Sequence, residues 1–97
     1  MIKRHEEQIL NRFDELYVNG CTQFTRGELR LWYGLTKVTK TIYADLYNRW
    51  TTMLEANLGE KEAQKELESG REKILVFPKD DSLILFRNSM CKDLGEM

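Results

Sequence analysis

The chain has 97 residues, of which 41% are hydrophobic and 32% are charged, and its formal net charge is −1. This length suits one domain built around a single core, and the composition is that of a folded chain. No apolar run approaches the roughly 18–20 residues that span a bilayer, and a chain this close to neutral is unlike a non-specific nucleic-acid binder. We therefore expect one small soluble domain covering residues 1–97.

The first residues and the two cysteines indicate a cytoplasmic protein. Lys3 and Arg4 have no apolar stretch behind them, so the N-terminus is unlike a secretory signal. Cys21 and Cys91 lack metal-ligand spacing, and outside the secretory route both are expected to be free thiols. A disulfide between them stays open at this point.

Hydrophobic residues recur at intervals of three and four along much of the chain, which is the period of one helical face. The first such series contains Ile9 and Phe13, and Asn19-Gly20 ends it with residues that tolerate the left-handed conformation of helix ends. Thr25 and Glu28 have the spacing of a capping box at the start of a second helix. Helices are predicted near residues 3–18, 25–33, 39–57 and 60–69.

The C-terminal third predicts a β-hairpin. Residues 73–77 and 82–87 have the composition of strands, and Pro78–Asp81 between them is a four-residue turn of suitable chemistry. Both strands are apolar on both faces, whereas a hairpin with one face in water would alternate. Either the helices of the domain or a partner subunit must therefore cover the second face. The segment Cys21–Phe24 could also be extended.

The fold class that follows is mainly α with a C-terminal β-hairpin, a small α+β domain. Its core is predicted from the apolar positions that share a face of each element. Twelve residues are expected to be largely buried: Ile9, Phe13, Leu16, Leu29, Trp32, Ile42, Leu46, Trp50, Ile74, Val76, Leu83 and Leu85.

Residue types that carry catalysis or bind metals are sparse. His5 is the only histidine, no glycine-rich phosphate loop is present, and no local motif pairs a serine or cysteine with a histidine. We expect no enzymatic activity, no metal site and no cofactor. A carboxylate-only active site stays open, because the chain has 16 acidic residues.

The predicted elements follow the order helix, short extended segment, helix, tight turn, helix and hairpin. Thr25–Gly34 would be the scaffold helix, Leu35–Trp50 the turn and the recognition helix, and residues 73–87 the wing. This order resembles a winged helix-turn-helix DNA-binding domain, with the helix-turn-helix over about residues 25–57. The resemblance implies sequence-selective binding of duplex DNA, as in a small transcriptional regulator of a plasmid or phage.

A recognition helix presents its N-terminal residues to the major groove. Here those residues are short, polar or basic, and none belongs to the apolar ladder. The predicted DNA-binding residues are Arg26, Arg30, Thr36, Lys37, Thr39, Lys40, Thr41 and Ala44. We expect Lys37, Lys40 and Thr41 to face the groove and the two arginines to lie near phosphates. Residues 21–54 carry five basic and two acidic residues, so a net charge of +3 coincides with this pattern.

Two features depart from the resemblance. Lys40 stands where the common helix-turn-helix spacing has an apolar residue, and Asp80 and Asp81 at the wing tip would repel phosphate. The alternative function is non-catalytic protein–protein interaction, as in a small inhibitor or adaptor encoded by a mobile element. In that alternative, the acidic helix near residues 60–68 would contact a basic partner.

A homodimer is predicted, because the hairpin is apolar on both faces and DNA readers commonly pair so that two recognition helices meet successive major grooves. Tyr43 and Tyr47 flank the apolar ladder of the third helix. Either they lie at the edge of the core, or their hydroxyls donate to DNA phosphates.

Overall fold

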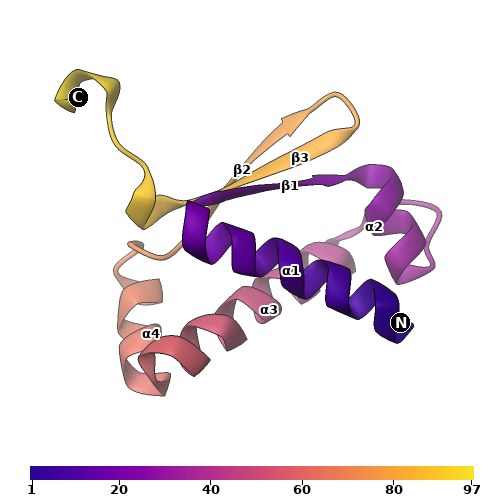
Figure 1. Ribbon diagram of the computed structural model, residues 1–97, viewed down its shortest axis with the longest axis horizontal. Helices are drawn as coiled ribbons and strands as arrows, with labels where there is room; N and C mark the ends of the chain where they lie inside the picture. The colour runs from indigo at the N-terminus through magenta and orange to yellow at the C-terminus, as the bar shows by residue number, and fades with distance from the viewer.

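The structure, a computed structural model, describes residues 1–97 and places four α-helices on one side of a three-stranded sheet or at its end (Figure 1). The helices are α1 (Lys3–Asn19), α2 (Arg26–Tyr33), α3 (Lys40–Leu58) and α4 (Glu60–Glu68), and the strands are β1 (Cys21–Thr25), β2 (Ile74–Lys79) and β3 (Ser82–Arg87). Two short 3₁₀ helices, η1 (Asn88–Met90) and η2 (Leu94–Glu96), follow in a tail that leaves the body of the domain (Figure 1). The predicted helices and strands are confirmed within two residues at each end. None of the helices combines the length and the apolar character that crossing a membrane requires.

The hairpin is part of a larger sheet, because the extended segment after α1 pairs with it. The strand order is β1-β3-β2, and both pairings are antiparallel. Thr22 of β1 and Val76 of β2 both pair with Leu85 of β3, so these three side chains share one face of the sheet. We call this the inner face, since Leu85 on it is buried against the helices.

One hydrophobic core lies between the inner face of the sheet and the helices. Its 13 buried side chains are those of Ile9, Phe13, Leu16, Phe24, Leu29, Trp32, Ile42, Leu46, Trp50, Leu54, Ala63, Leu83 and Leu85. Ten of the twelve residues that were predicted to be buried belong to this core. Phe24 is buried because β1 alternates, which turns its even-numbered residues inward.

The burial prediction was wrong for Val76, which is 49% exposed, and only partly right for Ile74, which is half-buried. Both residues belong to β2, an edge strand of the sheet. The helices pack mainly on β1 and β3, so the inner face of β2 is incompletely covered. The apolar run of residues 73–77 therefore predicted the strand correctly, but the prediction that its inner-face residues are buried was wrong.

The hairpin turn is shorter than the predicted Pro78–Asp81. Pro78 and Lys79 extend β2, and only Asp80 and Asp81 form the turn. Proline is tolerated there because it lies on an edge strand, where the missing N–H is not required by a neighbour. Asp80 takes the left-handed conformation with φ of 53°, as aspartate can in a tight turn.

The start of α2 is fixed by the predicted capping box. Thr25 Oγ1 accepts a hydrogen bond from the Glu28 amide, and a Glu28 carboxylate oxygen accepts one from the Thr25 amide, each at 3.0 Å. The Arg12 guanidinium of α1 donates to both carboxylate oxygens of Glu28 at 2.9 and 3.2 Å. The cap therefore also ties α2 to α1.

A buried ion pair joins the sheet to two helices. Arg87 Nε of β3 donates to Glu72 Oε2 at 2.7 Å, and the two side chains are only 12% and 6% exposed. Arg87 Nη1 donates to the Tyr17 carbonyl oxygen of α1 at 2.6 Å. Trp50 Nε1 of α3 donates to the Glu72 carbonyl oxygen at 2.7 Å. These contacts connect both α1 and α3 to the start and end of the hairpin.

Candidate nucleic-acid interface

The candidate interface is built from α2, the connection after it and α3. Gly34 ends α2 in the left-handed conformation with φ of 65°, which suits glycine because it has no Cβ. Residues 34–39 lead to α3, so the connection is longer than the tight turn predicted at Leu35–Val38. Thr39 occupies the N-cap position of α3, but its side chain makes no capping hydrogen bond.

A polar cluster connects α2 to α3. The Tyr33 hydroxyl at the end of α2 donates to Asp45 Oδ2 on α3, and Arg49 Nε donates to the same oxygen at 2.8 Å. Arg49 Nη1 also donates to Glu6 Oε1 of α1 at 2.6 Å. The cluster therefore joins all three helices that pack around the connection.

Ionisation within this cluster follows from its contacts. Partial burial opposes the charge on Asp45, but the hydrogen bonds from Tyr33 and Arg49 outweigh it, so the pKa of Asp45 lies below its ordinary value. Burial and the hydrogen bond to Asp45 raise the pKa of the Tyr33 hydroxyl. At neutral pH, Asp45 is charged and Tyr33 is a neutral donor.

The eight predicted DNA-binding residues are divided by exposure. The residues of the connection and of the first turns of α3 are exposed: Thr36, Lys37, Thr39, Lys40, Thr41 and Ala44. Arg26 and Arg30 on α2 are half-buried. None of the four basic residues in the two groups forms an ion pair. Arg49, the remaining basic residue of the segment 21–54, is committed to the polar cluster.

The structure places Arg26 away from the start of α3 and Arg30 next to the connection, where the Leu35 amide donates to the Arg30 carbonyl oxygen at 3.0 Å. The Arg30 guanidinium lies back over Gly27, where a Cβ would be 3.8 Å from its Nη2, and the Arg26 amide donates to the Asp81 carbonyl oxygen at 2.8 Å. Since α2 has eight residues, it separates the first of these arginines from the connection by about 12 Å. Arg26 therefore lies beside the acidic hairpin turn, and Arg30 lies one helical turn closer to the connection that leads to α3.

The N-terminus of α3 offers unpaired donors. The amides of Ile42 and Tyr43 donate to the Thr39 carbonyl oxygen at 3.1 and 3.3 Å, whereas those of Lys40 and Thr41 meet no acceptor in the protein. Such free amides carry the positive end of the helix dipole. They lie next to the exposed Lys37 and Lys40 side chains in the sequence.

The exposed face of α3 extends beyond the predicted DNA-binding residues. Thr41, Ala44 and Asn48 are exposed, and their spacing places them on one face opposite the buried Ile42 and Leu46. Asn48 was not among the predicted residues, although continuing the three-to-four spacing from Thr41 would have reached it. Its amide is a group that can make two hydrogen bonds to an adenine edge.

Tyr43 and Tyr47 lie on the flank of α3 that faces the sheet. Both line an apolar cavity between α3 and the inner face of the sheet, and they are 41% and 53% exposed. Their rings therefore lie beside core residues, and donation by their hydroxyls to DNA phosphates stays a prediction. They do not share the exposed face of Thr41, Ala44 and Asn48.

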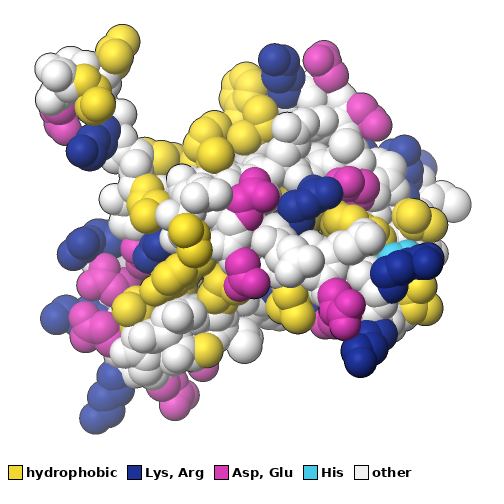
Figure 2. All heavy atoms as spheres, in the orientation of Figure 1, with side chains coloured by type: hydrophobic (Ala, Val, Ile, Leu, Met, Phe, Trp, Pro, Cys, Tyr) yellow, Lys and Arg dark blue, Asp and Glu magenta, His cyan; other side chains and the backbone are white.

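The side of the sheet that faces away from the helices carries a second apolar surface, the outer face. The cross-strand pairs Leu75–Phe86 and Phe77–Ile84 lie on it. Leu75 and Phe77 are 41% and 54% exposed, and Ile84 and Phe86 are half-buried. Figure 2 shows hydrophobic side chains along the hairpin at the upper edge of the molecule. The helices therefore cover only one of the two apolar faces of the hairpin.

Comparison with protein-family models, with curated proteins and with solved structures found no match to this chain. The structure contains no group of three or more His, Cys, Asp or Glu side chains that could hold a metal ion. Cys21 and Cys91 are both free and exposed. The choice of function therefore depends on the geometry and charge of the surfaces described above.

Proposed function

We propose that the protein binds duplex DNA sequence-selectively through the N-terminal end of α3 and acts as a small transcriptional regulator of the winged-helix type. The order α1, β1, α2, α3 and hairpin matches the order of elements on which the resemblance rests. In this proposal α4 is an addition between the recognition helix and the wing. The polar cluster of Tyr33, Asp45 and Arg49 supports the proposal, because it would hold the recognition helix rigidly against its scaffold.

The observation that carries the proposal is the combination of free charge and free amides at the start of α3. Lys37 and Lys40 are exposed and form no ion pair, and the amides of Lys40 and Thr41 have no acceptor. Lysine side chains and helix N-terminal amides are both phosphate-binding groups. Thr41, Ala44 and Asn48 would then face the base edges, because they continue the same exposed surface along α3.

The test begins with selection of preferred duplexes from a random pool, followed by titration at several salt concentrations. Lys37→Ala/Lys40→Ala should weaken binding to all duplexes alike and should reduce the salt slope by about one unit per lost phosphate contact. Lys61→Ala/Lys65→Ala on α4 is the matched control, since it removes the same charge from exposed positions of another helix. Absence of any salt-sensitive binding by the parent protein at low ionic strength would overturn the proposal.

Sequence preference has its own test. Asn48→Ala removes no charge, so it should leave the salt slope unchanged while relaxing selectivity at one base pair by about 1–3 kcal/mol. Repeating the selection with this variant measures the change. Unaltered selectivity in Asn48→Ala would mean that Asn48 does not contact the base edges. The test with the lysine variants would be unaffected by that result.

A second candidate function, protein–protein interaction, is favoured by one observation. The outer face of the sheet exposes Leu75 and Phe77 without any helix of the chain over them. An apolar surface of this kind is typical of contact with another protein. Helix α4, by contrast, contains four glutamates and two lysines. This mixture of charges gives it little preference for a basic partner.

A further inference from the structure

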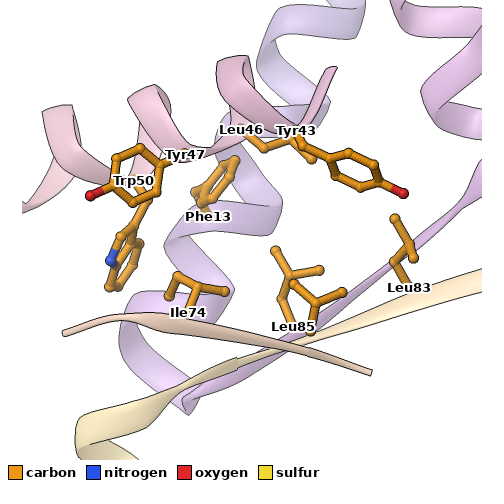
Figure 3. A pocket seen from close by; sticks show the side chains of 9 residues that line it. Phe13, Tyr43, Leu46, Tyr47, Trp50, Ile74, Leu83 and Leu85 are labelled. Carbon is orange, nitrogen blue, oxygen red and sulfur yellow. The ribbon is translucent and has the colours of Figure 1, made fainter. Parts of the chain in front are cut away.

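The cavity between α3 and the sheet has only hydrophobic walls. It measures about 170 Å³ and is lined by nine side chains, all of them hydrophobic (Figure 3). Leu46 and Trp50 approach it from α3, and Val76 and Leu85 from the strands. Water in a protein interior needs two to four polar partners, which these walls do not provide. An apolar occupant therefore suits the cavity better than water does.

The cavity opens to solvent. Three of the side chains that line it, Tyr43, Tyr47 and Val76, are 41%, 53% and 49% exposed. Figure 3 shows the two tyrosine hydroxyls at opposite ends of the group, pointing away from its centre. The tyrosines therefore offer a ligand their rings and no hydrogen-bonding group inside. This arrangement selects against charged and strongly polar molecules.

We propose that this cavity binds a small, uncharged, apolar molecule of about the size of one aromatic ring. The volume supports the size, because an enclosed apolar cavity of about 150 Å³ in another protein binds benzene or xenon. The aromatic walls support the class, because Trp50 and the two tyrosines can pack edge-on against a ring. This binding site is independent of the DNA-binding proposal and uses a different face of α3.

The test uses the full-length chain with benzene and indole as probes and the indole N–H resonances of its two tryptophans as reporters. Trp50 lines the cavity, and its Nε1 donates to the Glu72 carbonyl oxygen at 2.7 Å. Trp32 lies elsewhere in the core and is the internal comparison. Benzene should shift the Trp50 resonance saturably and leave that of Trp32 in place. Indole should bind more weakly if one ring sets the size limit.

Two variants of neighbouring residues on β2 localise the site. Val76→Trp places a large side chain at the opening of the cavity and should weaken benzene binding by at least about tenfold, since close packing leaves no room for both. Leu75→Trp adds a similar volume on the outer face and should bind benzene like the parent. The melting temperature of each variant verifies that it is folded. If Val76→Trp fails to fold, the smaller Val76→Leu should still weaken benzene binding relative to the parent.

Three outcomes would overturn the proposal. In the first, benzene fails to produce a saturable shift of Trp50. In the second, Leu75→Trp weakens binding as much as Val76→Trp, which would assign the probe to the outer face. In the third, benzene does not bind and Val76→Trp alters the sedimentation of the protein, which would assign the cavity to an apolar side chain of a partner subunit.

Discussion

Removal of Arg87 should lower stability strongly without emptying the hydrophobic core. Its guanidinium, 4.2 Å from the centre of the Tyr17 ring, neutralises a Glu72 side chain that is 6% exposed. Arg87→Met would leave that carboxylate buried without a partner, so we expect the free energy of unfolding to fall by about 3–5 kcal/mol. Urea denaturation measures this change.

Arg71→Met is the matched control for this prediction. Arg71 forms an ion pair with Glu66 at 3.4 Å, but its side chain is 72% exposed. Solvent screens such a pair, and its loss should change the free energy of unfolding by less than about 1 kcal/mol. Equal effects of the two substitutions would mean that burial of the Arg87–Glu72 pair contributes nothing measurable.

Asp45 should make the protein sensitive to acid. Its pKa in the folded state lies below the ordinary value of 3.8, so the stabilisation is complete above that pH and is lost as the pH falls through the folded pKa. Asp45→Asn should therefore be less stable than the parent at pH 7, with the difference shrinking below about pH 4. Thermal melts between pH 7 and pH 2 test this, with Asp14→Asn as an exposed control. A constant difference across that range would contradict the assigned role.

At the scale of elements, the sequence pattern predicted the helices and strands, which depend on neighbouring residues in the chain. It missed features that depend on how the elements pack together. Helical spacing located the helices, and Gly20 located the end of the first one, because glycine permits the left-handed conformation that it takes there. The exposure of Val76 was missed, since a continuous apolar run does not reveal that its strand lies at the edge of a sheet. Pro78 was misread as turn for the same reason.

In the candidate interface, too, the sequence predicted local features and missed those that depend on packing. Exposure of Lys37, Lys40 and Thr41 followed from their position outside the apolar ladder. The bond between Tyr33 and Asp45 did not follow, because it joins two helices across a connection whose path the sequence leaves undetermined. The contact between the Arg26 amide and Asp81 did not follow either, since it depends on the docking of the hairpin turn against α2.

The acidic hairpin turn should weaken DNA binding in the proposed function. Asp80 and Asp81 are exposed and lie beside the first turn of α2, where the Arg26 amide contacts the turn. Asp80→Asn/Asp81→Asn should raise affinity by roughly three- to tenfold at low ionic strength and by less at high salt. Asparagine also tolerates the left-handed conformation of Asp80, so the turn should be preserved.

Fluorescence anisotropy with the selected duplex measures this effect. Glu60→Gln/Glu62→Gln on α4 is the matched control, since it removes two exposed negative charges from another element. If the α4 variant gains as much affinity as the turn variant, net charge and not the hairpin turn is responsible, and the wing has no special place near the DNA.

The whole molecule has one sheet, whose hairpin is apolar on both faces, and only one layer of helices (Figure 1). The outer face of three strands of five or six residues covers roughly 300 Å², taking about 4.8 Å between strands and 3.3 Å per residue. A stable interface buries about 800 Å² on each partner, so the hairpin alone is too small. The C-terminal tail adds Leu94 and Met97, which are 87% and 82% exposed. A dimer that uses the outer face must therefore also recruit the tail or another surface.

We expect the parent protein to be a homodimer in solution and Phe77→Ser to shift it toward monomer. Phe77 is 54% exposed on the outer face, so its removal should affect association more than folding. Leu94→Ser should weaken the dimer as well, because the outer face alone is too small. Val18→Ser is the control, since Val18 is 70% exposed on α1 and lies outside both surfaces. Sedimentation velocity over a range of concentrations distinguishes these cases. A parent that stays monomeric at high concentration would remove the dimer, and two recognition helices could then not meet successive major grooves about 34 Å apart.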